Sequence, residues 1–410
     1  MDAWPGLCKV PAMSTLPLEG LRVVELSHMV MGPACGMLLA DLGAEVLKVE
    51  PIGGDRTRHL LGSGSGFFPL FNRNKKSLAI DLSQPEGLAV VRRLCADADV
   101  LVENFKPGAL ARLGLDHASL AAVNKRLIYV SHKGFLPGPY QDRPALDEVV
   151  QMMGGLAYMT GRPGDPLRAG ASVNDILGGL FGALGVLAAL VRRGITGRGM
   201  EVQAALFENN LLLMGQHILQ AAITGQPVAP MPARQSPWAV YDVFTVKDGG
   251  QIFLAAVSDA QWQSLCDALD LPALKVDPAW QSNNQRVQAR PSLLPMLRAH
   301  AAQFSVEELA ERMAAAGLPY APIRRPEDLL TDPHVLATGG LVPITSPEGQ
   351  TLQVPLLPLL LDGTRLGVRL DPPRCGEHTL EVLASAGWSK SDLENLLVRG
   401  IVAQAAGPAD

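Results

Sequence analysis

The chain has 410 residues, of which 48% are hydrophobic and 18% charged, and its formal net charge is −5. This length exceeds that of one ordinary core, so we expect two domains, and the composition excludes a disordered protein. The negative charge and the 5% of aromatic residues argue against a nucleic-acid partner, which needs a basic field or stacking platforms.

Cysteine usage and the N-terminus indicate a cytoplasmic protein. The five cysteines (Cys8, Cys35, Cys95, Cys266 and Cys375) contain no C-x-x-C pair, a pattern typical of reduced thiols and not of a disulfide frame or a zinc site. The first sixteen residues hold one lysine, one aspartate and two prolines, unlike a secretory signal or a transit peptide. The longest apolar run, residues 176–191, is shorter than the roughly 20 residues that span a bilayer, so we expect a buried helix and no membrane partner.

The first half of the chain alternates short apolar runs with helical stretches. Strands are predicted at residues 21–26, 45–50, 100–103 and 127–131, because these runs are rich in leucine and β-branched residues. Helices are predicted at residues 32–42, 85–96, 145–156 and 176–192. Strand–helix–strand alternation predicts parallel pairing, so the fold class is α/β with a Rossmann-like parallel sheet.

The texture changes near residue 226. Residues 226–237 hold four prolines without periodicity and predict a linker, and residues 241–246 and 251–257 flank a Lys-Asp-Gly-Gly turn and predict a hairpin. Helical segments follow to about residue 316. We therefore expect a large α/β domain at 17–225, a small α+β domain at 226–330, and a segment at 331–410 that returns to the large domain.

A parallel sheet with Glu50 ending its second strand suggests a dinucleotide-binding unit, in which an acid about 20 residues after the glycines holds the ribose. No G-x-G-x-x-G follows the first strand, where the chain reads SHMVMGPA, and no phosphate loop with a G-K-[ST] ending occurs. A hydride-transfer enzyme is therefore disfavoured.

Several segments, in their order and spacing, resemble the class III CoA-transferase family. They are residues 18–26 (LEGLRVVEL), 42–50 (LGAEVLKVE), 72–77 (NRNKKS), 102–108 (VENFKPG) and 196–199 (TGRG), with Gly32-Pro33, Gly54-Asp55, Gly154-Gly155 near Gln151, Thr160-Gly161 and Asn174-Asp175. The resemblance implies an enzyme that takes acyl-CoA as substrate without a permanently bound cofactor or metal. It also implies an interlocked-ring homodimer, with which the long proline-rich connection and the returning C-terminal segment agree.

Asp175 matches the nucleophilic aspartate of that family. A carboxylate attacks a thioester to give a mixed anhydride, and the released thiolate then leaves an aspartyl-CoA thioester for the incoming acid. Asp175 precedes the apolar run, so backbone N–H groups at a helix start would favour developing negative charge. An aspartate in this place also serves as an ordinary helix cap, and the two roles can coexist.

The resemblance further assigns CoA contacts. Arg112, Asn104, Phe105 and Leu82 match positions around the nucleotide, and an arginine fork suits phosphate geometry. Lys75 and Lys76 are candidates for added charge, and the alternative for all three cations is a solvated surface residue. Ser83 stands where the family has a further CoA-contacting lysine.

Asp147 matches an acidic family position, and His28 follows the first strand, where ligands of open α/β sheets collect. Both are candidate catalytic residues, although a lone histidine is commonly structural. Formyl-CoA transferase has a glutamine at Val30, a tyrosine at Leu146 and a glycine-rich loop at residues 258–261, so these departures disfavour formate–oxalate exchange.

The donor acid and the acceptor acid are both expected to be dicarboxylic, with succinyl-CoA as donor. Residues 54–58 and 72–77 resemble the corresponding segments of enzymes that use such substrates. An arginine would bind the distal carboxylate in a bidentate manner. The candidates are Arg56, Arg58, Arg73 and Arg168. Their alternative role is solubility or contact with CoA phosphates.

Two other functions remain as alternatives. A 2-methylacyl-CoA racemase of the same superfamily needs a histidine where this chain has Leu146, which cannot exchange a proton. A non-catalytic acyl-CoA-binding protein would have no need for Asp175.

Overall fold

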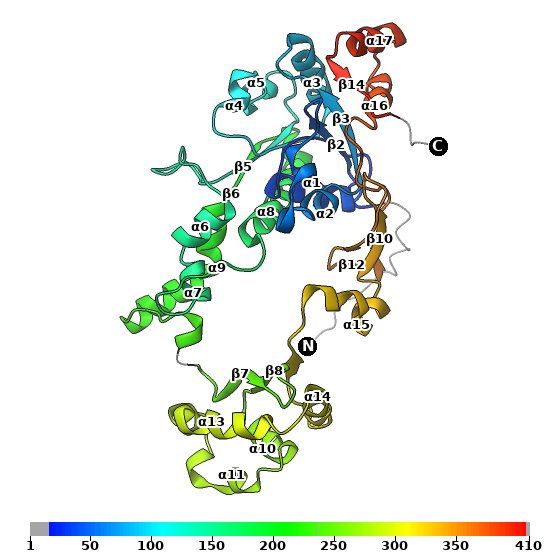
Figure 1. The fold of residues 1–410 in the computed structure, drawn as a ribbon. Helices are drawn as coiled ribbons and strands as arrows, with labels where there is room; N and C mark the ends of the chain where they lie inside the picture. Colours follow the sequence, from blue (N-terminus) through cyan, green and yellow to red (C-terminus); the bar gives the residue numbers. More distant parts are fainter. Residues whose placement is uncertain (1–15, 235, 407–410) are drawn as a thin grey trace, which may run out of the picture. The chain divides into compact units, whose positions relative to one another are not determined.

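The protein is described by a computed structural model that covers residues 16–234 and 236–406 (Figure 1). Residues 1–15, which include Cys8 and the N-terminal segment discussed above, lie outside the described residues. The chain forms two compact units: one ends at Pro232 and resumes at Ala337, and the other spans Ala233–Leu336. These divisions fall six or seven residues after the boundaries expected from the sequence.

A seven-stranded sheet with the order β14-β3-β2-β1-β4-β5-β6 forms the first unit. All neighbours are parallel except β14 and β3. The strands are β1 Arg22–Leu26, β2 Glu45–Glu50, β3 Lys75–Ile80, β4 Val100–Glu103, β5 Ile128–Lys133, β6 Glu201–Ala205 and β14 Val402–Ala403. This is the doubly wound order of a Rossmann-like sheet, so the predicted fold class is confirmed.

The four strands expected from apolar runs are all present, but β3 and β6 were not predicted. β3 begins with Lys75 and Lys76, and β6 carries Glu201 and Gln203, so neither gives the continuous apolar run of a strand buried on both faces. Strands with charged residues of this kind can be recognised only when the residues that pair with them are known.

Helices cover both faces of the sheet. On one face α1 (Met31–Asp41) and α8 (Val173–Thr196) pack over Val23 and Val46; on the other, α3 (Pro85–Asp97), α16 (Thr379–Ser385) and α17 (Lys390–Val398) pack over Val24 and Leu47. The alternation along β1 and β2 follows from the two-residue period of a strand. The contact of α1 with α8 is close because α8 presents glycines: a Cβ on Gly179 would lie 2.6 Å from the Cβ of Ala34.

Helix α8 is half-buried rather than buried as expected. Within the described residues it is the one helix long and apolar enough to cross a membrane by length and composition, and its mean hydropathy is 1.8. Its glycine and alanine side packs against α1 and the sheet. Its other side leaves large apolar residues exposed: Ile176, Leu180, Leu184, Val191 and Ile195.

The remaining helices of the first unit before residue 232 lie between its strands or, in the case of α9, after β6. They are α2 Phe67–Phe71, α4 Ala109–Arg112, α5 His117–Ala121, α6 Asp147–Met153, α7 Leu156–Thr160 and α9 Leu206–Thr224. The helix predicted at residues 145–156 is interrupted at Gly154 and Gly155, the second of which has a φ of 90°. This backbone break separates α6 from α7.

The second unit is α+β. Strands β7 Val240–Thr245, β8 Gln251–Ala256 and β9 Tyr320–Pro322 form an antiparallel sheet, and the predicted hairpin turns at Gly249, whose φ is 79°. The helices are α10 Asp259–Ala268, α11 Pro272–Val276, α12 Asn283–Gln288, α13 Arg290–Ala301 and α14 Val306–Ala315, followed by α15 Pro333–Ala337 at the boundary. Phe244 and Trp262 lie in its core.

The C-terminal segment rejoins the first unit. It forms the hairpins β10 Leu341–Thr345 with β11 Thr351–Pro355 and β12 Leu360–Leu361 with β13 Thr364–Arg365. Its end then pairs β14 with β3, and Figure 1 shows α16, α17 and β14 (red and orange) beside β3 and α3.

Candidate active site

Four candidate residues follow the carboxyl ends of neighbouring parallel strands. His28 follows β1, Leu82 follows β3, and Asn104 and Phe105 follow β4. Asn104 holds the loop after β1: its Oδ1 accepts from the N–H of His28 at 3.0 Å and its Nδ2 donates to the carbonyl of His28 at 2.7 Å. The rings of His28 and Phe105 lie 5.7 Å apart. These contacts therefore hold the loops at the carboxyl edge of the sheet, where ligand binding is predicted.

Buried ion pairs stabilise the loops at this edge of the sheet. Lys48 donates to the carbonyl of Ser27 at 2.9 Å and pairs with Asp55 at 2.8 Å, and Glu25 pairs with Lys75 at 2.7 Å. The side chain of Asp55 also accepts from the N–H of Thr57. Each buried charge thus has an opposite partner, as its desolvation requires.

Asp175 lies in the first turn of α8, at the same edge of the sheet. Helix α8 leads into β6, which is parallel to β5, so the crossover helix starts at the carboxyl edge and ends at the amino edge. A Cβ on Gly178 would lie 2.2 Å from Cε of Met31, the first residue of α1. The first turns of the two helices are therefore neighbours, and the side chain of Asp175 is half-buried.

Asp147 caps the helix that carries Asp175. Its Oδ2 accepts from the backbone N–H groups of Asn174 at 2.7 Å and of Asp175 at 3.0 Å, whereas Ser172, at the N-cap, makes no side-chain cap bond. Its Oδ1 accepts from Nε2 of the buried Gln151. Asp147, predicted as a catalytic residue, is thus engaged with the backbone of Asp175, which is a positioning contact.

The electrostatics of the pair act on Asp175. Burial, and then the negative charge of Asp147, raise the pKa of Asp175 from 3.8 to about 7. Both causes disfavour the ionised form. A carboxyl group that is balanced between its two forms near neutral pH, in a site at the edge of the sheet, is typical of catalytic carboxylates.

The predicted CoA contacts divide into two groups. Leu82 and Phe105 pack against the same core cluster, and Arg112 lies exposed at the end of α4. Lys75 and Lys76, in contrast, begin β3 and so lie towards the amino end of the strands. The ammonium group of Lys75 is fully buried against Glu25, and that of Lys76 pairs with Glu45 and Glu381. The placement of these lysines does not suit the expected phosphate contact.

The four candidate arginines also differ. The guanidinium of Arg58 pairs with Glu50 at 2.6 Å, and that of Arg73 pairs with Asp41 at 2.7 Å near the amino end of β3. Arg168 is exposed and pairs with Glu148. Arg56 is exposed in the loop after β2, and among these four it alone has no ion pair within the part of the chain that the structure describes. Arg58 and Arg73 are therefore structural residues, contrary to their expected role.

The carboxylate of Glu50 is occupied within the protein and does not have the place of a ribose ligand. It accepts from Arg58, from Ser77 and from the N–H of Asp55.

Gln151 is a residue to which the sequence pattern gave no role of its own. Its side chain bonds to residues that are 4 and 18 positions away.

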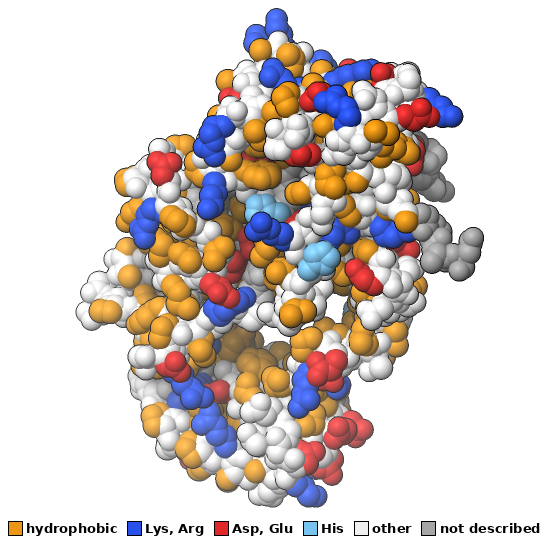
Figure 2. All heavy atoms as spheres, turned by 45° about the horizontal axis from the view of Figure 1, so that its top comes forward, with side chains coloured by type: hydrophobic (Ala, Val, Ile, Leu, Met, Phe, Trp, Pro, Cys, Tyr) orange, Lys and Arg blue, Asp and Glu red, His pale blue; other side chains and the backbone are white. Residues whose placement is uncertain are grey.

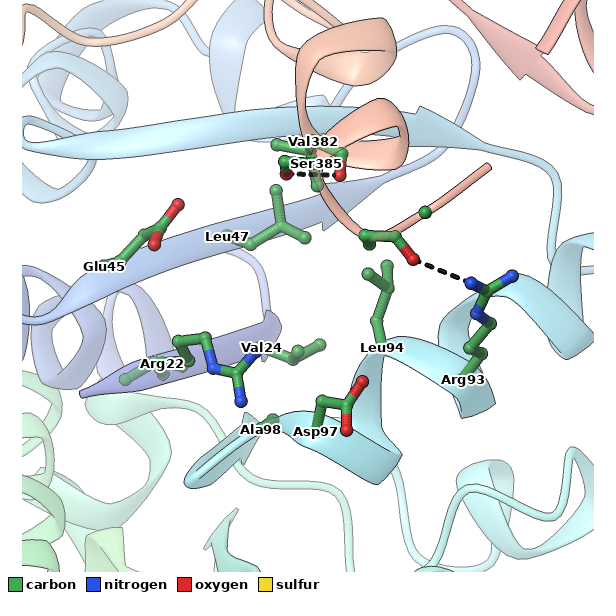
Figure 3. A pocket seen from close by; sticks show the side chains of 13 residues that line it. Arg22, Val24, Glu45, Leu47, Arg93, Leu94, Asp97, Ala98, Val382 and Ser385 are labelled. Carbon is green, nitrogen blue, oxygen red and sulfur yellow. Dashed lines mark hydrogen bonds between the residues drawn. The ribbon is translucent and has the colours of Figure 1, made fainter. Parts of the chain in front are cut away.

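A hollow of about 360 Å³ lies beside Asn104, Phe105 and Arg112, and Glu103, Lys106 and Ala111 are among the residues that line it. A cavity of about 390 Å³ opens at the amino ends of β1 and β2, lined by Arg22, Glu45 and Asp97, and Figure 3 shows Arg93 donating to a carbonyl at its rim. On the face drawn in Figure 2, basic and acidic side chains intermingle, which suits a small charged ligand better than a polyanion.

Comparisons with known proteins agree with this geometry. The model of CoA-transferase family III matches residues 18–379. The chain is 34% identical over 381 residues to a succinate–glutarate CoA-transferase of Agrobacterium fabrum, covering 90% of this chain and 95% of that one. It is 31% identical over 409 residues to a succinyl-CoA:glutarate CoA-transferase of Mus musculus, covering 98% and 94%.

Among solved structures, a CAIB/BAIF family protein from Brucella suis superposes with a TM-score of 0.82 at 33% identity, covering 91% of this chain and all of that one. Family match, relatives and fold agree with the residues brought together at the carboxyl edge of the sheet. The chain belongs to CoA-transferase family III and is a CoA-transferase.

Proposed function

We propose that the protein transfers CoA from succinyl-CoA to a second dicarboxylic acid through covalent intermediates on Asp175. The observation that carries the proposal is the half-buried carboxyl of Asp175 in the first turn of α8, with its pKa raised to about 7. The position offers a carboxylate nucleophile beside the backbone N–H groups of a helix start.

The reaction proceeds in two symmetrical halves. The ionised carboxylate of Asp175 attacks the thioester carbon, a C–O bond forms, the C–S bond breaks, and CoA leaves as a thiolate. The thiolate then attacks the Asp175 carbonyl of the mixed anhydride, which releases the donor acid as a carboxylate and leaves an aspartyl-CoA thioester.

The acceptor carboxylate attacks that thioester and expels the thiolate, which then attacks the acceptor carbonyl of the new anhydride. The products are the acceptor acyl-CoA and the original Asp175 carboxylate. No proton is gained or lost overall, so the cycle needs no separate general acid.

The surroundings of Asp175 suit this chemistry. The tetrahedral intermediates carry negative charge, and the positive end of the α8 dipole lies at the reacting carboxyl. Asp147 holds the two N–H groups of the first turn, so the nucleophile is fixed through its own backbone. Leu146, directly before Asp147, is apolar and exposed and provides no second base for a racemase.

The test of the nucleophile is chemical trapping. The enzyme is mixed with acyl-CoA and treated with hydroxylamine or borohydride, and the labelled peptide is identified by mass spectrometry. The label is expected on the peptide that contains Asp175, and Asp175→Asn is expected to lose both label and transfer. A label confined to another peptide would move the nucleophile elsewhere.

Two observations support dicarboxylate substrates. Relatives carry the names succinate–glutarate CoA-transferase and, in Chloroflexus aurantiacus at 33% identity over 394 residues, succinyl-CoA–D-citramalate CoA-transferase. In this chain Arg56 is exposed after β2, and the loop that carries it is tied to the loop after β1, because the N–H of Met29 donates to Oγ1 of Thr57 at 2.9 Å. We assign the distal carboxylate to Arg56.

A monocarboxylate cannot form the bidentate ion pair with Arg56, so succinyl-CoA is expected to exceed butyryl-CoA in kcat/KM by about tenfold, equivalent to roughly 1.4 kcal/mol. Arg56→Met should remove this preference, whereas Arg192→Met, which removes an exposed charge at the other end of α8, should keep it. Equal kcat/KM for both donors in the wild type would end the dicarboxylate assignment and leave the transferase chemistry intact.

The same structure supports a homodimer. The outer side of α8 and the neighbouring helix α9 expose large apolar residues, among them Ile195 and Ile223 at 84% and 83%. Exposed large apolar residues on two neighbouring helices are typical of an interface, and we propose that a second copy of the chain covers them in an interlocked ring. Asp175 begins this helix, so the site would lie beside the interface.

A further inference from the structure

Gln151 is a fully buried glutamine that touches neither the nucleophile nor the solvent. Its Nε2 donates to Oδ1 of Asp147, and its Oε1 accepts from the N–H of Ala169 at 2.8 Å. The orientation of its amide follows from its partners, because a backbone N–H only donates and the Asp147 carboxylate accepts from two backbone N–H groups as well.

The bonds of Gln151 and Asp147 together join three separate pieces of the chain. Gln151 lies on α6, one turn after Asp147, and Ala169 belongs to the strap of residues 161–172 that leads from α7 into α8. Asp147 in turn holds the N–H groups of Asn174 and Asp175. The position of the first turn of α8 therefore depends on one continuous set of hydrogen bonds that passes through Gln151.

We propose that Gln151 is a positioning residue for CoA transfer: it fixes the carboxylate of Asp147 so that this carboxylate holds the backbone of Asp175. The inference rests on the proposed function, in which Asp175 is the nucleophile. Without Gln151, Oδ1 of Asp147 is left without its buried donor, and the carboxylate is held only through Oδ2 by the two backbone N–H groups.

Several charged or titratable groups lie on the elements around α8. Asp147 and Glu148 lie on α6, and Arg162, Asp165 and Arg168 lie on the strap, where Arg168 pairs with Glu148. Glu208 on α9 accepts from the N–H of Leu136, and the buried His132 of β5 packs against Gly182 of α8. Helix α1 contributes the buried thiol of Cys35 and, at its last residue, Asp41, which pairs with Arg73. Asp147 is the charged side chain that contacts the backbone of Asp175 directly. Removing its support therefore acts on the nucleophile and not on a diffuse field.

The test compares Gln151→Met with Gln151→Glu. Methionine has a similar length and makes neither hydrogen bond. A protonated glutamate reproduces both, because its O–H donates to Asp147 and its carbonyl accepts from Ala169, but an ionised glutamate loses the donor and repels Asp147.

We expect Gln151→Met to lower kcat by about 10- to 100-fold at every pH with the KM for acyl-CoA nearly unchanged. We expect Gln151→Glu to work like wild type at about pH 6 and to fall towards Gln151→Met at about pH 8.5, because its buried carboxyl ionises in this range. A ratio of Gln151→Glu to wild-type kcat that is constant with pH, or a Gln151→Met variant within twofold of wild type, would overturn the inference.

Asn124→Leu is the matched control. The side chain of Asn124 donates to the carbonyls of Cys95 and Ala98 at the amino edge of the sheet and accepts from the N–H of Arg126, so this change removes three hydrogen bonds. It should lower the melting temperature without changing the pH dependence of kcat. Asp175→Asn is assayed alongside: full transfer by that variant would refute the proposed chemistry and the inference with it, whereas a dead Asp175→Asn beside pH-independent Gln151→Glu would refute the inference alone.

Discussion

The raised pKa of Asp175 makes the stability of the protein depend on pH, and Asp175→Asn should remove this dependence. Because the folded protein keeps the Asp175 proton up to about pH 7, whereas the unfolded chain loses it near 3.8, the folded state binds more protons between these values. The contribution of this group to the free energy of unfolding therefore falls as pH rises from about 4 to 7 and stays low above that range. Asparagine has the same shape and no charge, so the variant does not lose this part of the free energy of unfolding as pH rises.

The size of the effect follows from the same shift. A pKa raised from 3.8 to about 7 sets an upper limit of about 4 kcal/mol on the cost of ionising Asp175 in the folded state. Since the side chain of Asp175 is only half-buried and solvent screens its charge, we take the ionisation cost as about half of that limit. Of this cost, about 1 kcal/mol of unfolding free energy is lost between pH 5 and 8.5. For a protein of 410 residues that corresponds to roughly 1 °C in melting temperature.

The assay is thermal unfolding of wild type and Asp175→Asn, followed by circular dichroism at one scan rate at pH 5 and 8.5. The melting temperature of the variant should exceed that of wild type by about 1 °C more at the higher pH than at the lower. Asp142→Asn, which changes an exposed carboxylate beside Gln141, should show no such widening. A difference that is constant with pH, or that narrows, would refute the reasoning.

Three further predictions follow from the same contacts. The kcat/KM for transfer should increase with pH with a midpoint near 7, since only ionised Asp175 attacks. Asp147→Asn should move that midpoint lower but not to 3.8, because the burial of Asp175 remains. An unmoved midpoint in a steady-state pH series would contradict the effect of the Asp147 charge. Arg73→Met should cost about 3–5 kcal/mol in urea unfolding because Asp41 is left buried without its ion pair, and a cost below about 1 kcal/mol would show that the pair is dispensable. A mixture of tagged and untagged homodimers should not exchange subunits on dilution, because interlocked rings separate only by partial unfolding, and rapid exchange seen by native mass spectrometry would exclude interlocking.

Much of the fold was readable from local pattern. The apolar runs at residues 21–26, 45–50, 100–103 and 127–131 correspond to four strands of the sheet. Their alternation with helices predicted parallel pairing, because a crossover helix joins parallel strands. The carboxyl edge, where His28 and Asn104 meet, follows from that topology. The expected nucleophile came from the family resemblance, since an aspartate at the start of an apolar helix is by itself typical of a helix cap.

Tertiary structure alone decided which charged side chains are free. Arg73 and Lys75 have the composition of surface residues, yet their partners, Asp41 and Glu25, are 32 and 50 positions earlier in the chain, and no local pattern reveals such pairs. The same holds for Asp147, whose carboxylate meets the backbone of Asp175 across 28 residues. Strand and helix formation depend on neighbours within a few residues, whereas the burial of a charge depends on whether the fold brings it an opposite charge or a donor, and that is settled only when distant segments pack.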